Sequence, residues 1–158
     1  MSEPIEPVRA TVEVRRGIED AFRVFTAGIA TWCPVAGHSV EPGKVVAVVL
    51  EDRVGGRLYE RWHDGGEADW GQVLAWEPPT RLLLAWSPNP ERPAPTEVEV
   101  RFLAVEAGRT RVELEHRGWE RLGELAAQAR DSYRDGWPSV LDAYAATATA
   151  TAKRLAAG

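Results

Sequence analysis

Apolar and polar residues alternate along much of the chain, and this alternation predicts a series of half-buried β-strands. In the first such segment the apolar side chains between Val8 and Val14 share one face. An Asp-Gly pair at residues 64–65 predicts a tight hairpin turn, because it tolerates the positive φ angles that such a turn requires. The strands expected on these grounds are Val8–Val14, Val45–Leu50, Arg57–Trp62, Ala68–Trp76, Arg81–Trp86, Thr96–Glu106 and Thr110–Arg117.

Apolar residues recur at helical spacing just after the first expected strand. This pattern starts at Ile18 and predicts a first helix that stops at Gly28. A short second helix is expected over Ile29–Trp32, because Pro34 prevents it from continuing.

A second helical pattern covers the C-terminal part of the chain. Apolar residues keep steps of three and four from Leu122 to Leu155, which makes one continuous stripe. Pro138 interrupts this pattern, and a proline inside a helix removes a hydrogen bond and kinks the helix. We therefore expect a shorter segment over about residues 119–133 and the main helix over about residues 135–155.

The predicted order is one strand, one or two short helices, six strands and a long helix. Consecutive strands with short turns form an antiparallel meander, so we expect an α+β fold with a sheet of six or seven strands. At 158 residues the chain suits one domain with one core. A flexible N-terminus is expected over residues 1–7 and a single domain over residues 8–158.

Composition and charge exclude several classes of function. The net charge of −5 and the even spread of the arginines argue against a nucleic-acid-binding protein. No apolar run approaches the roughly 20 residues that a membrane-spanning helix needs. The N-terminus has no basic-then-apolar signal, and the single cysteine, Cys33, cannot form an internal disulfide. We therefore expect a cytoplasmic protein.

Several motifs follow one another in an informative order. They are Phe22–Pro34, Gly55–Arg61, Trp70–Pro79, Thr110–Trp119 and Tyr133–Trp137, the last followed by Val140 and Leu141. This set resembles the START-like, or SRPBCC, superfamily, in the branch named after the activator of Hsp90 ATPase. The resemblance implies a helix-grip fold, in which a curved antiparallel sheet wraps around a long C-terminal helix. It also implies a hydrophobic cavity between the sheet and that helix.

The tryptophans call for an explanation, because the chain contains seven of them. Any one of them is explained as a large core residue. As a set they favour a pocket, since aromatic side chains with a polar edge often line ligand sites, whereas cores packed for stability mostly use Leu, Ile and Val. The residues that we expect to line the cavity are Trp32, Tyr59, Trp70, Trp86, His116, Tyr133 and Trp137.

His116 is the best single candidate for polar chemistry. The alternation of its strand places it on the inward face, where it would bond to a ligand, transfer a proton or bond to a neighbouring protein group. Glu60, like Glu113 and Glu115, is expected on a solvated strand face. Isolated histidines predict no metal site, Cys33 has no identifiable base, and no glycine-rich phosphate loop occurs. We therefore expect no cofactor and assign no catalytic residue.

Fold does not settle function, and three hypotheses follow. The leading one is a protein that holds a small apolar or aromatic molecule between the sheet and the C-terminal helix. The first alternative is a cyclase, hydrolase or dehydratase in the same cavity, with His116 and Tyr59 transferring protons. The second alternative is an interaction module for a chaperone or a transcriptional partner.

Two partner expectations accompany these hypotheses. The eukaryotic co-chaperone that gave the branch its name has an additional N-terminal domain for Hsp90, for which this chain has no room, and many small bacterial relatives have no known Hsp90 role. Binding to Hsp90 is therefore not expected. An edge strand offers a route to a homodimer.

Overall fold

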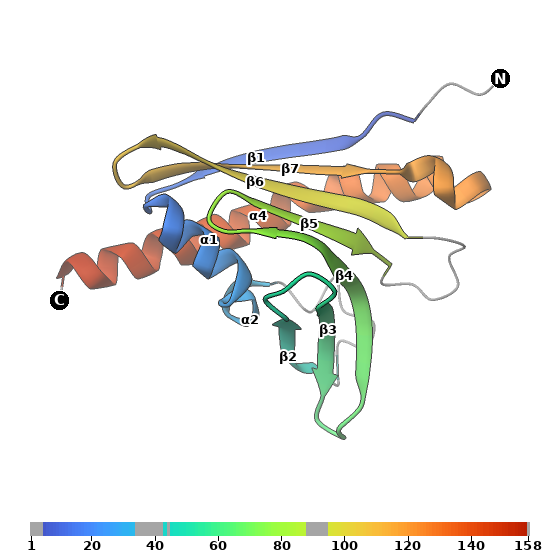
Figure 1. Ribbon diagram of the computed structural model, residues 1–158, viewed down its shortest axis with the longest axis horizontal. Coiled ribbons are helices and arrows are strands. Elements are labelled where there is room, and N and C mark those ends of the chain that lie inside the picture. The colour runs from blue at the N-terminus through green and yellow to red at the C-terminus, as the bar shows by residue number, and fades with distance from the viewer. Residues whose placement is uncertain (1–4, 34–42, 44, 88–94, 158) are drawn as a thin grey trace.

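The computed structural model describes residues 5–33, 43, 45–87 and 95–157, with the side chains of residues 150–157 left out. Within this part of the chain, seven antiparallel strands form one sheet in the order β1-β7-β6-β5-β4-β3-β2. In Figure 1 the strands β1, β7, β6 and β5 run alongside the long helix, whereas β4, β3 and β2 bend away from it. The strands are β1 (Val8–Val14), β2 (Val45–Leu50), β3 (Arg57–Trp62), β4 (Glu67–Glu77), β5 (Arg81–Trp86), β6 (Thr96–Glu106) and β7 (Arg109–Arg117).

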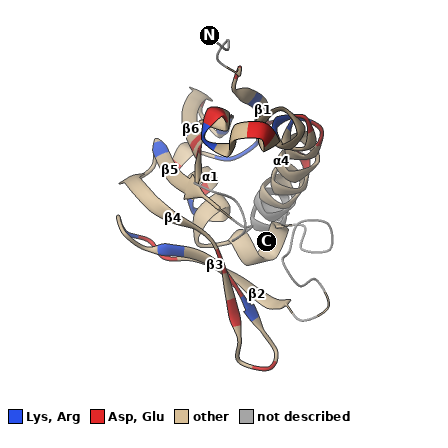
Figure 2. Cartoon of the chain, turned by 90° about the vertical axis from the view of Figure 1, so that its right-hand side faces the viewer, with Lys and Arg blue, Asp and Glu red and all other residues tan. Residues whose placement is uncertain are grey.

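Two short helices, α1 (Ile18–Thr26) and α2 (Ile29–Trp32), connect β1 to the rest of the sheet. A 3-10 helix, η1 (Trp119–Leu125), follows β7 and leads into the long helix α4 (Ala126–Ala157). The sheet curves so that α4 packs against β1 and lies on its concave side (Figure 2). The expected α+β helix-grip fold is confirmed. None of the described helices is both long enough and apolar enough to cross a membrane.

The division of the C-terminal helix is wrong. The helical axis breaks at Gly123, whose φ of 60° and ψ of −125° are non-helical, and α4 then runs unbroken through Pro138. A positive φ favours glycine, so the break falls at a residue that tolerates it. Pro138 removes one backbone donor, but the buried residues Trp137 and Val140 on either side hold the helix against the sheet. Tertiary packing therefore overrides the local preference.

One end of the space between the sheet and the helices is filled with aromatic rings. Phe22 contacts Phe102 and Trp76 edge-to-face, with ring centroids 5.1 and 5.2 Å apart. The ring of Phe25 lies 5.1 Å from that of Tyr144, whose hydroxyl donates to the Ala21 carbonyl at 2.7 Å. These contacts join α1 to α4 and fill the space around Tyr144, so space for a hollow is left nearer the N-terminal end of α4.

Candidate functional site

A hollow of about 290 Å³ remains between the concave face of the sheet and the first half of α4. Strands β3 to β7 form one wall, α2 and the end of α1 a second, and α4 the third. None of the lining residues that the structure describes carries a charge. They are Phe25, Ile29, Trp32, Cys33, Leu58, Trp70, Leu84, Trp86, Val98, Val100, Leu114, Ser132, Tyr133, Gly136, Trp137 and Val140.

Three of the expected residues, Trp86, Tyr133 and Trp137, meet in one corner of this cavity. The alternation of β5 turns Trp86 inward, and Tyr133 and Trp137 are four residues apart on one face of α4. The Trp86 ring centroid lies 5.4 Å from that of Trp137 and 6.5 Å from that of Tyr133. The Trp86 Nε1–H donates to the Tyr133 hydroxyl at 3.0 Å, which ties the sheet to the helix.

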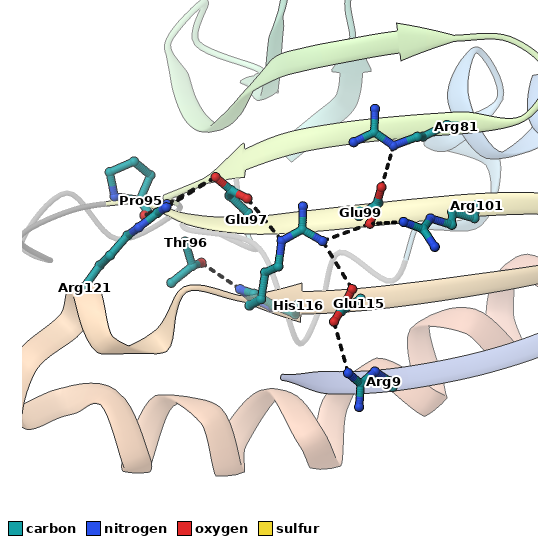
Figure 3. A network of polar contacts seen from close by, with 11 residues as sticks. Arg9, Arg81, Pro95, Thr96, Glu97, Glu99, Arg101, Glu115, His116 and Arg121 are labelled. Carbon is teal, nitrogen blue, oxygen red and sulfur yellow. Dashed lines mark hydrogen bonds and ion pairs between the residues drawn. The ribbon is translucent and has the colours of Figure 1, made fainter. Parts of the chain in front are cut away.

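His116 lies directly behind this corner and does not line the cavity. It faces inward as expected, but its side chain is 0% exposed. Its Nδ1 accepts from the Trp137 Nε1–H at 3.0 Å. Its Nε2 lies 2.7 Å from the Thr96 Oγ1 (Figure 3). Its ring also packs on that of Trp119 with the centroids 4.1 Å apart. Both ring nitrogens are therefore occupied by protein groups.

The electrostatics of His116 also argue against proton transfer. Burial lowers the pKa of His116 from 6.5 to about 3, because the charged form would lose its hydration. The imidazole is thus neutral at physiological pH. A general base needs both a suitable pKa and contact with its substrate, and this side chain has neither in the cavity.

Trp70 enters the cavity from β4, held by a carboxylate that the sequence did not indicate. Its Nε1–H donates to the Glu60 Oε1 at 2.7 Å, and the Trp62 Nε1–H donates to the Glu60 Oε2 at the same distance. Glu60 is 0% exposed, so its assignment to a solvated strand face is wrong. The reason is that Leu58, Glu60 and Trp62 share the concave side of β3, where the two indoles replace water as donors.

Tyr59 lies on the opposite, convex side of β3 and does not line the cavity, so its expected orientation is wrong. The Arg57 guanidinium lies over its ring, 4.1 Å from the centroid, and the Arg61 Nη2 donates to its hydroxyl at 3.0 Å. A bulge in β4 explains why Tyr59 and Trp70 do not share a face as expected. Leu58 pairs with Gly71 but Tyr59 with Asp69, so Trp70 is an extra residue in β4. The extra residue shifts which side chains of the two strands share a face.

Trp32 and Cys33 close the cavity from the side of α2. The Trp32 Nε1–H donates to the Val24 carbonyl at 2.9 Å, and its ring lies 5.0 Å from that of Phe25. Cys33 is partly exposed, and burial raises the pKa of its thiol to about 11. Cys33 is therefore protonated at neutral pH and is not an activated nucleophile.

Sequence reasoning missed the aliphatic floor of the cavity and its edge on α4. The floor is formed by inward residues such as Val98 and Val100, which the alternation of β6 predicted as core but not as lining. On α4, Ser132 and Gly136 precede Val140 at steps of four, so the helical period relates them. Within the described residues, no group of three or more His, Cys, Asp or Glu side chains could hold a metal ion.

Comparison with known proteins gives a family match over most of the chain. The sequence profile of the family described as Activator of Hsp90 ATPase homolog 1-like protein matches residues 16–149. A search of curated proteins found no match.

The solved structures with similar folds include the following three. The anthrahydroquino-gamma-pyrone synthase Txn09 complexed with SUM is 34% identical, with a TM-score of 0.61 and coverage of 92% of this chain and 98% of that one. The self-sacrificing resistance protein CalC from Micromonospora echinospora is 28% identical, with a TM-score of 0.67 and coverage of 90% and 93%. The Aha1 dimer from Colwellia psychrerythraea, at 18% identity, TM-score 0.61 and coverage of 92% and 97%, shares the fold. The expected resemblance is thus confirmed, and the chain belongs to the family of activator of Hsp90 ATPase homolog 1-like proteins.

Proposed function

We propose that this protein binds a small apolar or aromatic molecule in the cavity between the sheet and α4. The observation that carries the proposal is a hollow of about 290 Å³ whose described lining is aromatic and aliphatic and has no charged side chain. Ligand pockets usually range from about 300 to 1,000 Å³, so this one suits a compact molecule, such as two or three fused rings, better than a long lipid.

The hydrogen-bond donors of the cavity support an apolar ligand. The indole N–H groups of Trp32, Trp70, Trp86 and Trp137 donate to Val24, Glu60, Tyr133 and His116, respectively. A ligand oxygen placed deep in the cavity would therefore lose its water without gaining an indole donor. A ligand that buries about 300 Å² of apolar surface gains about 7 kcal/mol before the costs of association.

The relatives support a small-molecule function and also favour a second candidate. The 34% identical relative is a synthase complexed with SUM, and the 28% identical relative is a resistance protein. The second candidate is therefore a synthase or cyclase reaction in the same cavity. His116 and Tyr59 do not line it, so the side-chain groups for such chemistry would be the Tyr133 and Ser132 hydroxyls.

A fluorescence titration with N-phenyl-1-naphthylamine, a neutral aromatic probe, tests the binding proposal. We expect saturable binding with micromolar affinity. Ser132→Trp would fill the edge of the cavity and weaken probe binding at least about tenfold, the factor that 1.4 kcal/mol represents. Ser139→Trp is the matched control, because Ser139 is also exposed on α4 but does not line the cavity. Non-saturable binding, or equal effects of both variants, would contradict the proposal.

Cys33 offers a second readout, because it lines the cavity and the chain contains one cysteine. Mass spectrometry after reaction with N-ethylmaleimide reports labelling at this thiol alone. We expect a saturating probe to slow the labelling several-fold. Native mass spectrometry of the freshly purified protein would identify any molecule that it retains.

The remaining partner hypotheses stay predictions. A homodimer would form through β1 or β2, the two edges of the described sheet, and light scattering over a range of protein concentrations measures this. A pull-down with Hsp90 tests the chaperone alternative, for which we expect no binding.

A further inference from the structure

A chain of hydrogen bonds connects two walls of the cavity through groups that do not line it. It starts at the Trp137 indole, passes through His116 and Thr96, and ends at the Trp86 backbone carbonyl, 3.3 Å from the Thr96 Oγ1. Thr96 and His116 are both buried, at 3% and 0% exposure. The chain therefore lies in a dry region, where hydrogen bonds are strong and an unmade one is costly.

The direction of each hydrogen bond in this chain follows from the chemistry of its first donor. An indole Nε1–H can only donate, so the Nδ1 of His116 carries no proton. The imidazole is neutral, so its proton lies on Nε2 and is donated to the Thr96 oxygen. The Thr96 hydroxyl therefore donates its own proton to the Trp86 backbone carbonyl. Only one tautomer of His116 and one orientation of its ring satisfy every partner.

We propose that His116 and Thr96 are positioning residues that hold the rings of Trp86 and Trp137 at a fixed mutual angle and so select the shape of the aromatic ligand. The two indole planes are inclined by 55°, with centroids 5.4 Å apart. Rotating the Trp137 ring breaks its bond to His116 and leaves a buried acceptor unpaired. The ligand-selecting part of this inference rests on the proposed binding function, whereas the tautomer and its hydrogen bonds do not.

This role differs from that of an ordinary core residue. Trp86 is fastened twice, by its backbone carbonyl to Thr96 and by its indole to the Tyr133 hydroxyl. Trp137 is fastened once, at the nitrogen of His116. A polar group in a core costs free energy unless every bond is made, but a complete network specifies one geometry. Two aromatic walls with fixed orientations discriminate between ligand shapes better than freely rotating ones.

Nitrogen NMR of the histidine rings tests the first half of the proposal, the hydrogen-bond chain through His116, without any ligand. At pH 7 and at pH 5 we expect His116 to show a protonated Nε2 and an unprotonated Nδ1, with slow exchange of the Trp137 indole proton. The exposed His63 provides an internal reference in the same spectrum. A proton on Nδ1, or a doubly protonated ring at pH 5, would overturn the proposed hydrogen-bond chain.

A pair of conservative variants tests the second half of the proposal, the effect of this hydrogen-bond chain on ligand binding. Thr96→Val keeps the shape of the side chain but removes the hydroxyl, whereas Thr96→Ser keeps the hydroxyl. We expect Thr96→Val to weaken N-phenyl-1-naphthylamine binding about 5- to 20-fold and to speed exchange of the Trp137 indole proton, and Thr96→Ser to stay within about twofold of the unmodified protein.

Equal probe affinity in both variants would show that Thr96 acts only in packing and would overturn the positioning role. If the unmodified protein binds no probe but shows the expected tautomer, the binding function fails while the hydrogen-bond chain stands. If Thr96→Val does not fold, the proposal can still be overturned, because a proton on the His116 Nδ1 of the unmodified protein would remove the hydrogen-bond chain on which it depends.

Discussion

The two faces of the sheet use the same strands for opposite purposes. On the concave face β6 presents Val98 and Val100 to the cavity, and the alternate residues Glu97, Glu99 and Arg101 lie on the convex face. There, ion pairs run across four strands, from Arg81 on β5 to Arg9 on β1 (Figure 3). The charged side chains of the convex face thus pair with one another. None of the described residues that line the cavity on the concave face carries a charge.

Two buried carboxylates sharpen this comparison. On the convex face, burial alone would raise the pKa of Glu99, but hydrogen bonds from Arg81 and Arg117 and the charge of Arg101 outweigh it and lower the pKa to about 2. On the concave face, Glu60 accepts hydrogen bonds from two indoles. The first carboxylate anchors an ionic network across strands, whereas the second orients an aromatic wall. Burial alone therefore does not reveal what a carboxylate does in this sheet.

The largest effect is expected from removing the concave carboxylate. Glu60→Ala would leave the Trp62 and Trp70 indole donors without this acceptor and should lower the free energy of unfolding by about 2–4 kcal/mol. Glu60→Gln, which keeps one acceptor oxygen, should cost roughly half as much. Urea unfolding curves measure both variants, with the exposed Glu124→Ala as a control expected within about 0.5 kcal/mol of the unmodified protein. A Glu60→Ala curve that matches this control would refute the orienting role of Glu60.

The second prediction concerns the pH dependence of the free energy of unfolding, which should differ between the two faces of the sheet. Because the pKa of His116 is about 3 in the folded protein and 6.5 ordinarily, the unfolded chain binds the extra proton first. The contribution of neutral His116 is therefore complete above pH 6.5 and is lost as the pH falls from 6.5 towards 3, at up to about 1.4 kcal/mol per pH unit. Unfolding at pH 7, 6 and 5 should show this slope, and His116→Asn should flatten it. An unchanged slope in that variant would assign the acid sensitivity to other groups.

The stabilising contribution of Glu99 on the convex face should be lost only in stronger acid than that of His116, and the loss should be smaller. The pKa of Glu99 lies below its ordinary value of 4.5, so its contribution is complete above pH 4.5 and disappears as the pH falls towards 2. Glu99→Gln should remove this part of the acid sensitivity and cost about 1–2 kcal/mol at pH 7. The cost is smaller than for Glu60→Ala because Arg81 and Arg117 keep other acidic partners. A larger loss for Glu99→Gln would reverse the comparison.

The smallest effect belongs to the rim of the convex network. Arg9 pairs with Glu115 at 3.3 Å, but its side chain is 68% exposed. Arg9→Ala should therefore change the free energy of unfolding by about 0.5 kcal/mol or less, and 0.5 M salt should remove the difference. Probe binding in the cavity should not change, so a fall in probe affinity in this variant would show that the two faces are coupled.

The sequence by itself determined which segments become strands and which face of most of them is buried. The period of two in β6 and β7 placed Val100, Leu114 and His116 inward, and the apolar stripe placed Tyr133 and Trp137 on the sheet side of α4. These assignments succeed because alternation and helical spacing are local properties of the chain. Five of the seven expected lining residues contribute to the described cavity wall: Trp32, Trp70, Trp86, Tyr133 and Trp137.

Only the tertiary structure decided the remaining features. A bulge at Trp70 in β4 puts Trp70, which lines the cavity, on the opposite face from Tyr59, and no alternating pattern reveals it because the extra residue is defined by the partner strand. Contacts with the sheet kept α4 helical through Pro138. His116 became an internal link because Thr96 and Trp137, 20 and 21 residues away, hold its two nitrogens. Local pattern fixes the side on which a residue lies, whereas its hydrogen-bond partners depend on how distant segments meet.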